Sequence, residues 1–186
     1  EKLNDLGHRA ELIPMPVDRS YVDDFTLYWG LMAFSLDRFG GRVIGKGFDR
    51  KKIDPFTHGL AQTFVKRIWR TPSAIRRLKK TDAVLAANYD RFDVVLSPTL
   101  AHTVPKIGYL DPAGDFDEVF DRLMKYVAFT PINNTTGTPA ISLPLATDSN
   151  GLPIGIHFMA HHGNERTLLE LAYELEAAIP FARINA

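Results

Sequence analysis

The amino-acid sequence predicts an α/β fold in which helices flank a mixed β-sheet. Two segments alternate between apolar and other residues at a period of two, which is typical of strands. The apolar positions that fall on one face of each segment are Ile141, Leu143 and Leu145, and then Ile154, Ile156 and Phe158. Between them, Ser149-Asn150-Gly151 indicates a hairpin turn. Helical patterns surround this hairpin, so the chain combines both kinds of element.

Length and composition limit the possible functions. A chain of 186 residues fits one domain, and we see no internal repeat and no linker. Its 22 basic and 22 acidic side chains give a formal net charge of zero. Because the overall field then attracts neither nucleic acid nor an anionic membrane, we expect neither as a partner. The chain contains no cysteine, which excludes disulfides and is compatible with the cytoplasm, the location that we expect.

The first elements are predicted from turn and capping residues. Gly7 is expected to close a short helix at the start of the chain. A short edge strand is expected at 10–16, where two prolines cannot donate to a ladder. Ser20 is the expected N-cap of a helix that runs to about Phe39 and ends at Gly40-Gly41. This helix is apolar around most of its circumference, so we expect burial on several sides.

Two further helices are predicted to begin at prolines. Asp54-Pro55 starts one that runs to about Arg70, and Thr71-Pro72 starts the next, which runs to about Arg91. Their junction carries seven cations with no acid between Asp54 and Asp82: Lys66, Arg67, Arg70, Arg76, Arg77, Lys79 and Lys80. Such a run can bind phosphate or nucleic acid if it gathers on one face. The helix boundary scatters the charges, so a solvated face is preferred.

The second half begins with an apolar run, DVVLSPT at 93–99, which predicts a strand buried on both faces. An irregular loop is expected at 101–114, and a short helix at 116–126. After the hairpin, Asn164 is expected to cap a last helix that ends before Pro180. Its apolar stripe comprises Leu168, Leu171, Ala172 and Leu175.

A polar segment leads into the first strand of the hairpin. Its residues are expected to form a loop at a strand edge with polar groups free to hold a ligand: Asn133, Asn134, Thr135, Thr136 and Gly137. Gly137 lets a backbone approach closely because it has no Cβ atom. An equal alternative is that the asparagines satisfy backbone groups in a turn. Phe129 is either an apolar wall of the pocket or a core residue.

Residues just after the strand 93–99 are a second candidate. Thr99 and His102 stand where α/β sheets hold ligands, at the carboxyl end of a strand, although a solvated loop histidine is the simpler interpretation. His161 and His162 are adjacent and point to opposite faces of an extended segment, so no metal site and no cofactor are expected. Ser97 and Ser142 lie in strand patterns without a nucleophile turn, and we expect no catalytic residue in this chain.

Four segments in order resemble the C-terminal portion of the amidase signature family. They are DVVLSPT, FTPINNTTGTPAISLPL, GLPIGIHFMA and NERTLLELAYELEAAIPF, and they extend over 93–181. Residues 1–92 resemble the more variable, mainly helical region of that family. The resemblance therefore implies that 1–186 is the C-terminal part of a single amidase domain, with helices around a mixed sheet.

The resemblance implies cleavage of a carboxamide C–N bond by a serine nucleophile, a bridging serine in a cis peptide and a lysine base. Enzymes of this kind act on linear, aryl or cyclic amides. In the family these residues lie upstream in a Gly/Ser-rich segment, and this sequence has no adjacent serines and no serine beside a glycine. The chain alone is therefore expected to be inactive. The expected partners are a small amide substrate and the missing N-terminal part of the same protein, and homo-oligomers are also possible. The alternative is a non-catalytic α/β binding or scaffold module.

Overall fold

The computed structural model describes residues 2–181 of the chain. The elements are α1 (Lys2–Asp5), α2 (Arg19–Val43), a 3-10 turn (Arg50–Lys52), α3 (Pro55–Arg67), a 3-10 turn (Ile68–Arg70), α4 (Thr71–Tyr89), β1 (Val95–Pro98), α5 (Phe116–Tyr126), α6 (Pro131–Thr136), β2 (Ala140–Thr147), β3 (Pro153–Met159) and α7 (Glu165–Ala178). The strands form one sheet in the order β1-β3-β2. The predicted α/β class is confirmed, although both strand pairs among these residues are antiparallel rather than mixed.

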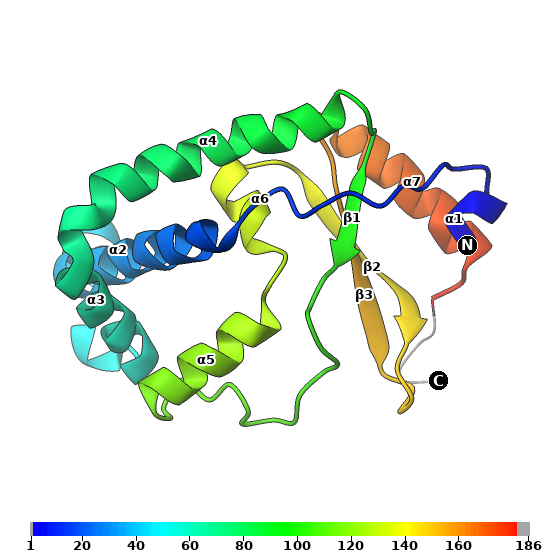
Figure 1. Ribbon diagram of the computed structural model, residues 1–186. Coiled ribbons are helices and arrows are strands. Elements are labelled where there is room, and N and C mark those ends of the chain that lie inside the picture. The colour runs from blue at the N-terminus through cyan, green and yellow to red at the C-terminus, as the bar shows by residue number, and fades with distance from the viewer. Residues whose placement is uncertain (1, 182–186) are drawn as a thin grey trace.

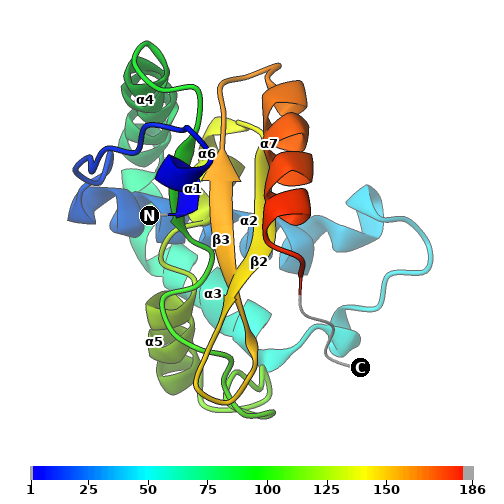
Figure 2. The ribbon, with the colours of Figure 1, turned by 90° about the vertical axis from the view of Figure 1, so that its right-hand side faces the viewer.

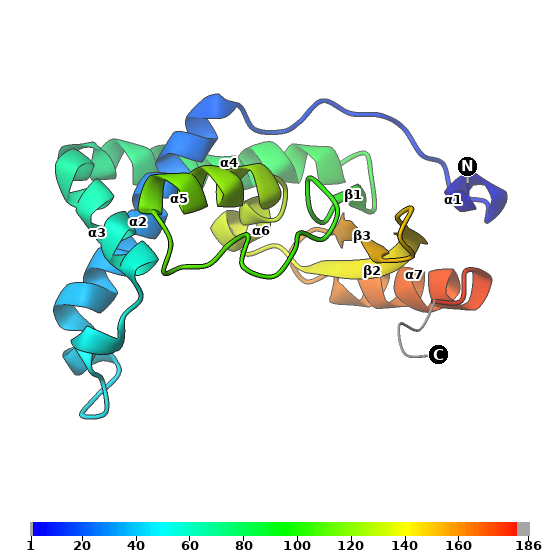
Figure 3. The same ribbon diagram turned by 90° about the horizontal axis from the view of Figure 1, so that it is seen from below.

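The elements divide into a helical half and a sheet half. In Figure 1, α2, α3, α4 and α5 surround α6 on one side, and the sheet with α7 lies on the other side. Figures 2 and 3 show that α7 covers one face of the β2–β3 hairpin. The extended segment 7–18 crosses the opposite face on its way from α1 to α2.

Both faces of the sheet contribute to apolar cores. The face toward α7 carries the residues that the period-two pattern predicts, except Ile154. The buried members of this core are Leu143, Phe158, Ala160, Leu168 and Leu175. On the opposite face, the sheet packs against α4 and α6 through Val95, Met159, Leu85 and Ile132. The hairpin, its turn at Gly151 and the apolar stripe of α7 are therefore confirmed.

The helical half has its own cores, in which α2 packs against α3 and α4. Two clusters fill these contacts, with the buried residues Leu27, Ala33, Phe56, Leu60, Ala61, Phe64, Ala74 and Val119. One face of α2 is open in this chain, because Met32 is 52% exposed and Val43 is 77% exposed. The expected burial of α2 on several sides is thus only partly confirmed. Among the described residues, no helix has the length and apolarity needed to cross a membrane.

Several helix ends differ from the prediction. Asp18, rather than Ser20, is the N-cap of α2, and its carboxylate accepts from the backbone N–H groups of Ser20 and Tyr21. The same helix continues through Gly40-Gly41 to Val43. Gly40 lies beneath the Phe48 ring, and its lack of a Cβ atom leaves room for that ring. The bounds of α5 agree with the prediction, and Asp54 caps α3 as expected.

Other predicted features were wrong. The segment 10–16 forms no strand, and Leu12 in it is fully exposed. Thr71 is the first residue of α4 rather than its cap, and its hydroxyl donates to the carbonyl of Ile68. The strand β1 lies at an edge of the sheet, where Leu96 is 48% exposed, so it is not buried on both faces.

Candidate functional site

The polar segment that was expected to be a loop is the short helix α6. Pro131 occupies its first turn, where the missing N–H costs nothing, and Gly137 ends it in the left-handed region with φ 74°. Ile132 is 4% exposed and anchors the helix in the core beside α4. Tertiary contacts therefore impose helix on a sequence whose Asn and Thr residues favour turns.

The two threonine hydroxyls of α6 are engaged within the helix. Thr135 Oγ1 donates to the carbonyl of Pro131 at 3.1 Å, and Thr136 Oγ1 donates to the carbonyl of Ile132 at 3.0 Å. These bonds are the back-bonding pattern common for threonine in helices. The expectation that their polar groups are free is therefore wrong for both donors.

Asn133 has one orientation that its neighbours determine. Its Nδ2 donates to the Thr138 carbonyl at 3.3 Å and to Thr138 Oγ1 at 2.9 Å. A carbonyl can only accept, so the amide nitrogen must face Thr138 and the oxygen Oδ1 must face away. Oδ1 is enclosed and has no hydrogen-bond partner among the described residues. An enclosed acceptor of this kind needs a donor, which a water molecule or a group beyond residues 2–181 can supply.

The other predicted site residues of this region differ in exposure. Asn134 and Gly137 are exposed at the carboxyl end of α6, and Phe129 is half-buried just before the helix. Thus Asn134 is exposed to solvent, whereas Asn133 is half-buried and its Oδ1 is enclosed. The segment is a helix terminus with one outward and one inward asparagine, rather than a strand-edge loop.

Thr99 lies in a second polar group, on the sheet face opposite α7. Its hydroxyl is 2.7 Å from the hydroxyl of Ser142, although β1 and β2 are not neighbours. The bond passes over Gly155 of the central strand, where a Cβ atom would lie 2.7 Å from Thr99 Oγ1 and 2.8 Å from Ser142 Oγ. Glycine is therefore required at this crossing.

His157 belongs to the same polar group and was not among the residues predicted from the sequence. It pairs in register with both Ser97 and Ser142, and its Nδ1 is 3.3 Å from Ser97 Oγ. Burial lowers the pKa of the His157 imidazole, so it is held in the neutral form. The period-two pattern contained the signal, because His157 stands between the inward-facing Ile156 and Phe158 and so points to the other face.

Tyr21 is a second residue that the sequence analysis missed. Its hydroxyl is 2.8 Å from Thr135 Oγ1, 114 residues away along the chain. Burial raises the pKa of the Tyr21 phenol to about 12, so it keeps its proton near neutral pH. No local pattern could indicate this contact, because it depends on how α2 and α6 pack.

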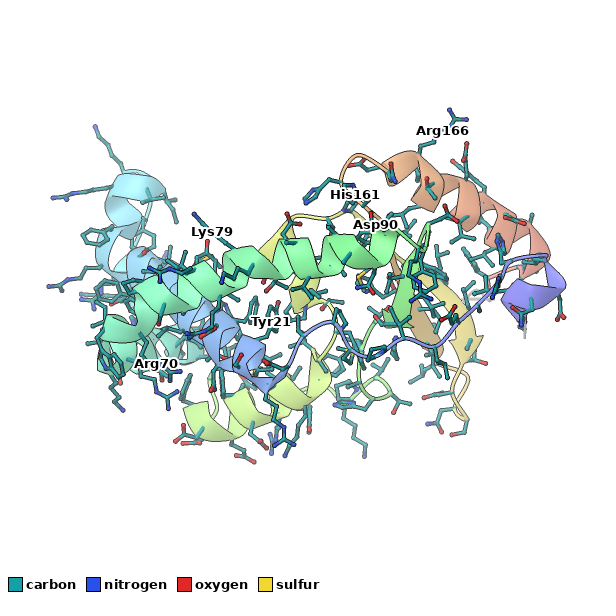
Figure 4. All side chains as sticks on the ribbon, turned by 45° about the horizontal axis from the view of Figure 1, so that its top comes forward. Tyr21, Arg70, Lys79, Asp90, His161 and Arg166 are labelled. Atoms are coloured by element: carbon teal, nitrogen blue, oxygen red, sulfur yellow. The ribbon has the colours of Figure 1, made fainter. Side chains whose placement is uncertain are left out.

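The remaining candidates do not form a site. His102 contacts the carbonyl of Thr103 and the ring of Tyr126 in the exposed loop, and His162 pairs with Asp82 at 3.0 Å. No group of three potential metal ligands occurs within residues 2–181. The cations of the α3–α4 junction are mostly exposed, and in Figure 4 Lys79 and Arg70 lie on different sides of α4.

The clefts of the described surface include two that the predicted binding residues do not line. The larger, of about 390 Å³, lies in the loop before α5 and is lined by Pro105, Lys106, Ile107, Gly108, Leu110, Asp111 and Tyr126. The smaller, of about 150 Å³, lies between the start of α2 and α4, and Tyr21, Asp24 and Arg77 border it. The α6 and Thr99 groups therefore lie outside these two clefts.

Comparison with known families identifies the chain. The family model described as Amidase matches residues 1–169. The chain belongs to the amidase signature family. Among curated amidase relatives, it is 49% identical over 184 residues to AmiC of Mycobacterium leprae and 46% identical over 185 residues to AmiC of Mycobacterium tuberculosis. Their names class both provisionally as amidases. The alignments cover 98% and 99% of this chain but 39% of each relative, so the chain spans about two fifths of their length.

Amidases acting on a cyclic substrate are also similar. The 6-aminohexanoate-cyclic-dimer hydrolase of Pseudomonas sp. (strain NK87) is 36% identical over 96 residues, which are 48% of this chain and 20% of that protein. A solved structure of a 6-aminohexanoate cyclic dimer hydrolase complexed with substrate aligns with a TM-score of 0.77 and 25% identity. That alignment covers 96% of this chain and 39% of the solved chain.

Proposed function

We propose that residues 1–186 are the C-terminal part of a single amidase domain that cleaves carboxamide C–N bonds. The observation that carries the proposal is the family match over 1–169, combined with a span of only 39% of the curated relatives. The catalytic serine, the bridging serine in a cis peptide and the lysine base would lie in the remaining part. The chain would supply strands of the sheet and residues of the substrate pocket.

The proposed contribution of this chain is to position the substrate. The exposed Asn134 amide can donate to a substrate carbonyl and accept from an amine, and the backbone at Gly137 permits close approach. Phe129 would form an apolar wall, and Thr99 would present its hydroxyl at the carboxyl end of β1. The groups of Asn133, Thr135 and Thr136 that bond internally would hold this surface in shape. Residues that only orient the reacting bond still raise the rate, although they take no part in the covalent step.

The proposal is tested with two proteins, the product of the full gene and the 186-residue chain. Each is assayed on a linear carboxamide, an acyl anilide and the 6-aminohexanoate cyclic dimer, the substrate in the name of one relative. We expect the full protein to hydrolyse at least one of these amides and the chain alone to hydrolyse none. Turnover by the chain alone, abolished by a point substitution within it, would contradict the proposal.

The full protein would have few partners. A small amide is the proposed substrate, and the remaining part of the domain would pack against this chain. The cytoplasm stays the predicted location, and homo-oligomerisation stays a possibility that the measurement of mass in solution decides. A full gene that lacks the Gly/Ser-rich segment would instead support a binding or scaffold module.

A further inference from the structure

The start of α2 is connected to α6 and to α4 by side chains on one face. Tyr21 contacts Thr135 of α6, and Asp24 accepts two hydrogen bonds from Arg77 of α4 at 2.6 and 2.7 Å. Because Tyr21 and Asp24 are three residues apart, they lie on the same side of the helix. In Figure 4, Tyr21 lies at the start of α2, below α4 in that view.

The direction of the Tyr21 hydrogen bond follows from the acceptors around it. Thr135 Oγ1 has one proton, and the Pro131 carbonyl, which can only accept, takes it at 3.1 Å. The Tyr21 hydroxyl is therefore the donor to Thr135 Oγ1 at 2.8 Å. A phenylalanine at position 21 would keep the ring but lose this donor.

The contact matters because α6 cannot be stable by itself. A helix of six residues is far below the length at which isolated helices form in water. Its position is set by the buried Ile132, by the packing of α4 and by the bond from Tyr21. Of these three, the hydrogen bond from Tyr21 is the one that holds the carboxyl half of α6, at Thr135, which directly follows Asn134. Asp24, which is 2% exposed, keeps the α2 end of this connection fixed to α4.

We propose that Tyr21 is a positioning residue for the substrate-binding surface, because its hydroxyl holds α6 through Thr135 in the orientation that directs Asn134 outward. The inference rests on the proposed function of α6. In this proposal Tyr21 makes no contact with the substrate. It acts only through the helix, so its loss loosens binding without removing a reacting group.

The test uses the full protein and its amide substrate. Tyr21→Phe is expected to raise KM by about threefold to tenfold, the equivalent of one neutral hydrogen bond, and to leave kcat within about twofold. Tyr28→Phe is the matched control on the same helix, because Tyr28 is 40% exposed and bonds to no side chain within residues 2–181. The control should keep the KM of the wild type. A purely structural role would lower the unfolding temperature and leave the KM of the folded enzyme unchanged.

A double substitution separates action through Thr135 from a general effect. In a Thr135→Val background, Tyr21→Phe should change KM no further, because the bond is already absent. Full additivity of the two changes, or an unchanged KM in Tyr21→Phe, overturns the inference and leaves the proposed function intact. Absence of amide hydrolysis by the wild-type full protein instead overturns the proposed function and, with it, this role of Tyr21.

Discussion

At the scale of single residues, Gly155 shows how the central strand controls its neighbours. Side chains of β1 and β2 normally cannot meet, because β3 separates them. The missing side chain at Gly155 opens a path for the bond between Thr99 and Ser142. This bond fixes the orientation of Thr99, one of the proposed substrate-binding residues.

Substitution of Gly155 by alanine is expected to destabilise the protein. The new Cβ atom would lie within 3 Å of both hydroxyl oxygens, so either side chain or the strand must move, at a cost of about 1–3 kcal/mol in the free energy of unfolding. Urea unfolding of the full protein measures this, and Gly47→Ala is the control, since nothing lies within 4 Å of its Cβ position. Adding Ser142→Ala should recover part of the loss. Equal stability of the two alanine variants would refute the argument.

At the scale of elements, helix ends in this chain differ in how well they are capped. The Asp54 carboxylate accepts from the backbone N–H of Thr57 at 2.8 Å and so satisfies one free donor of α3. Asn164 occupies the same position at α7, but its side chain makes no capping hydrogen bond. Capping residues were predicted at both places, so residue type alone does not reveal which cap is formed.

This difference predicts unequal effects of two similar substitutions. Asp54→Ala should lower the free energy of unfolding by about 1 kcal/mol, because it removes a formed cap. Asn164→Ala should change it by less than about 0.5 kcal/mol, since no such bond is lost. Thermal unfolding of both variants of the full protein compares them directly. A larger loss for Asn164→Ala would show that the cap geometry is wrong.

The elements also show what can be predicted from sequence. The hairpin and the apolar stripe of α7 follow from periodicity, because their shared core lies along one strand face and one helix stripe. The helix α6 could not be predicted, since Asn and Thr favour turns. Its stability comes from tertiary contacts, namely the packing of its own Ile132 against α4 and the sheet and the bond from Tyr21 of α2. His157 was within reach of the alternation argument, whereas the Tyr21 contact depends on tertiary structure.

At the scale of the whole molecule, the chain exposes surfaces that folded proteins normally cover. The strands β1 and β2 are both edges of the sheet, and Leu96 on β1 is half exposed. In the helical half, Val43 and Trp69 are 77% and 78% exposed. Unpaired edges and apolar side chains of this kind promote association.

The 186-residue chain is therefore expected to associate when it is produced alone. Light scattering during size-exclusion chromatography should give a mass above the 20.9 kDa of one chain. Under the proposed function, adding the remaining part of the domain in trans should reduce this association, because that part would cover the same surfaces. A stable monomer at all concentrations would contradict the prediction.

The pairing of β1 with β3 also has a kinetic consequence. Ser97 meets His157 across the sheet, 60 residues later in the chain, whereas the contacts of α2 with α3 join consecutive helices. Closing so long a loop lowers the chain entropy before the hydrogen bonds of the paired strands can compensate. Folds with distant contacts therefore form slowly. During synthesis, the helices α2, α3 and α4 can assemble first, whereas β1 stays unpaired until β3 has left the ribosome. The sheet should therefore be the last part of this chain to acquire its native order.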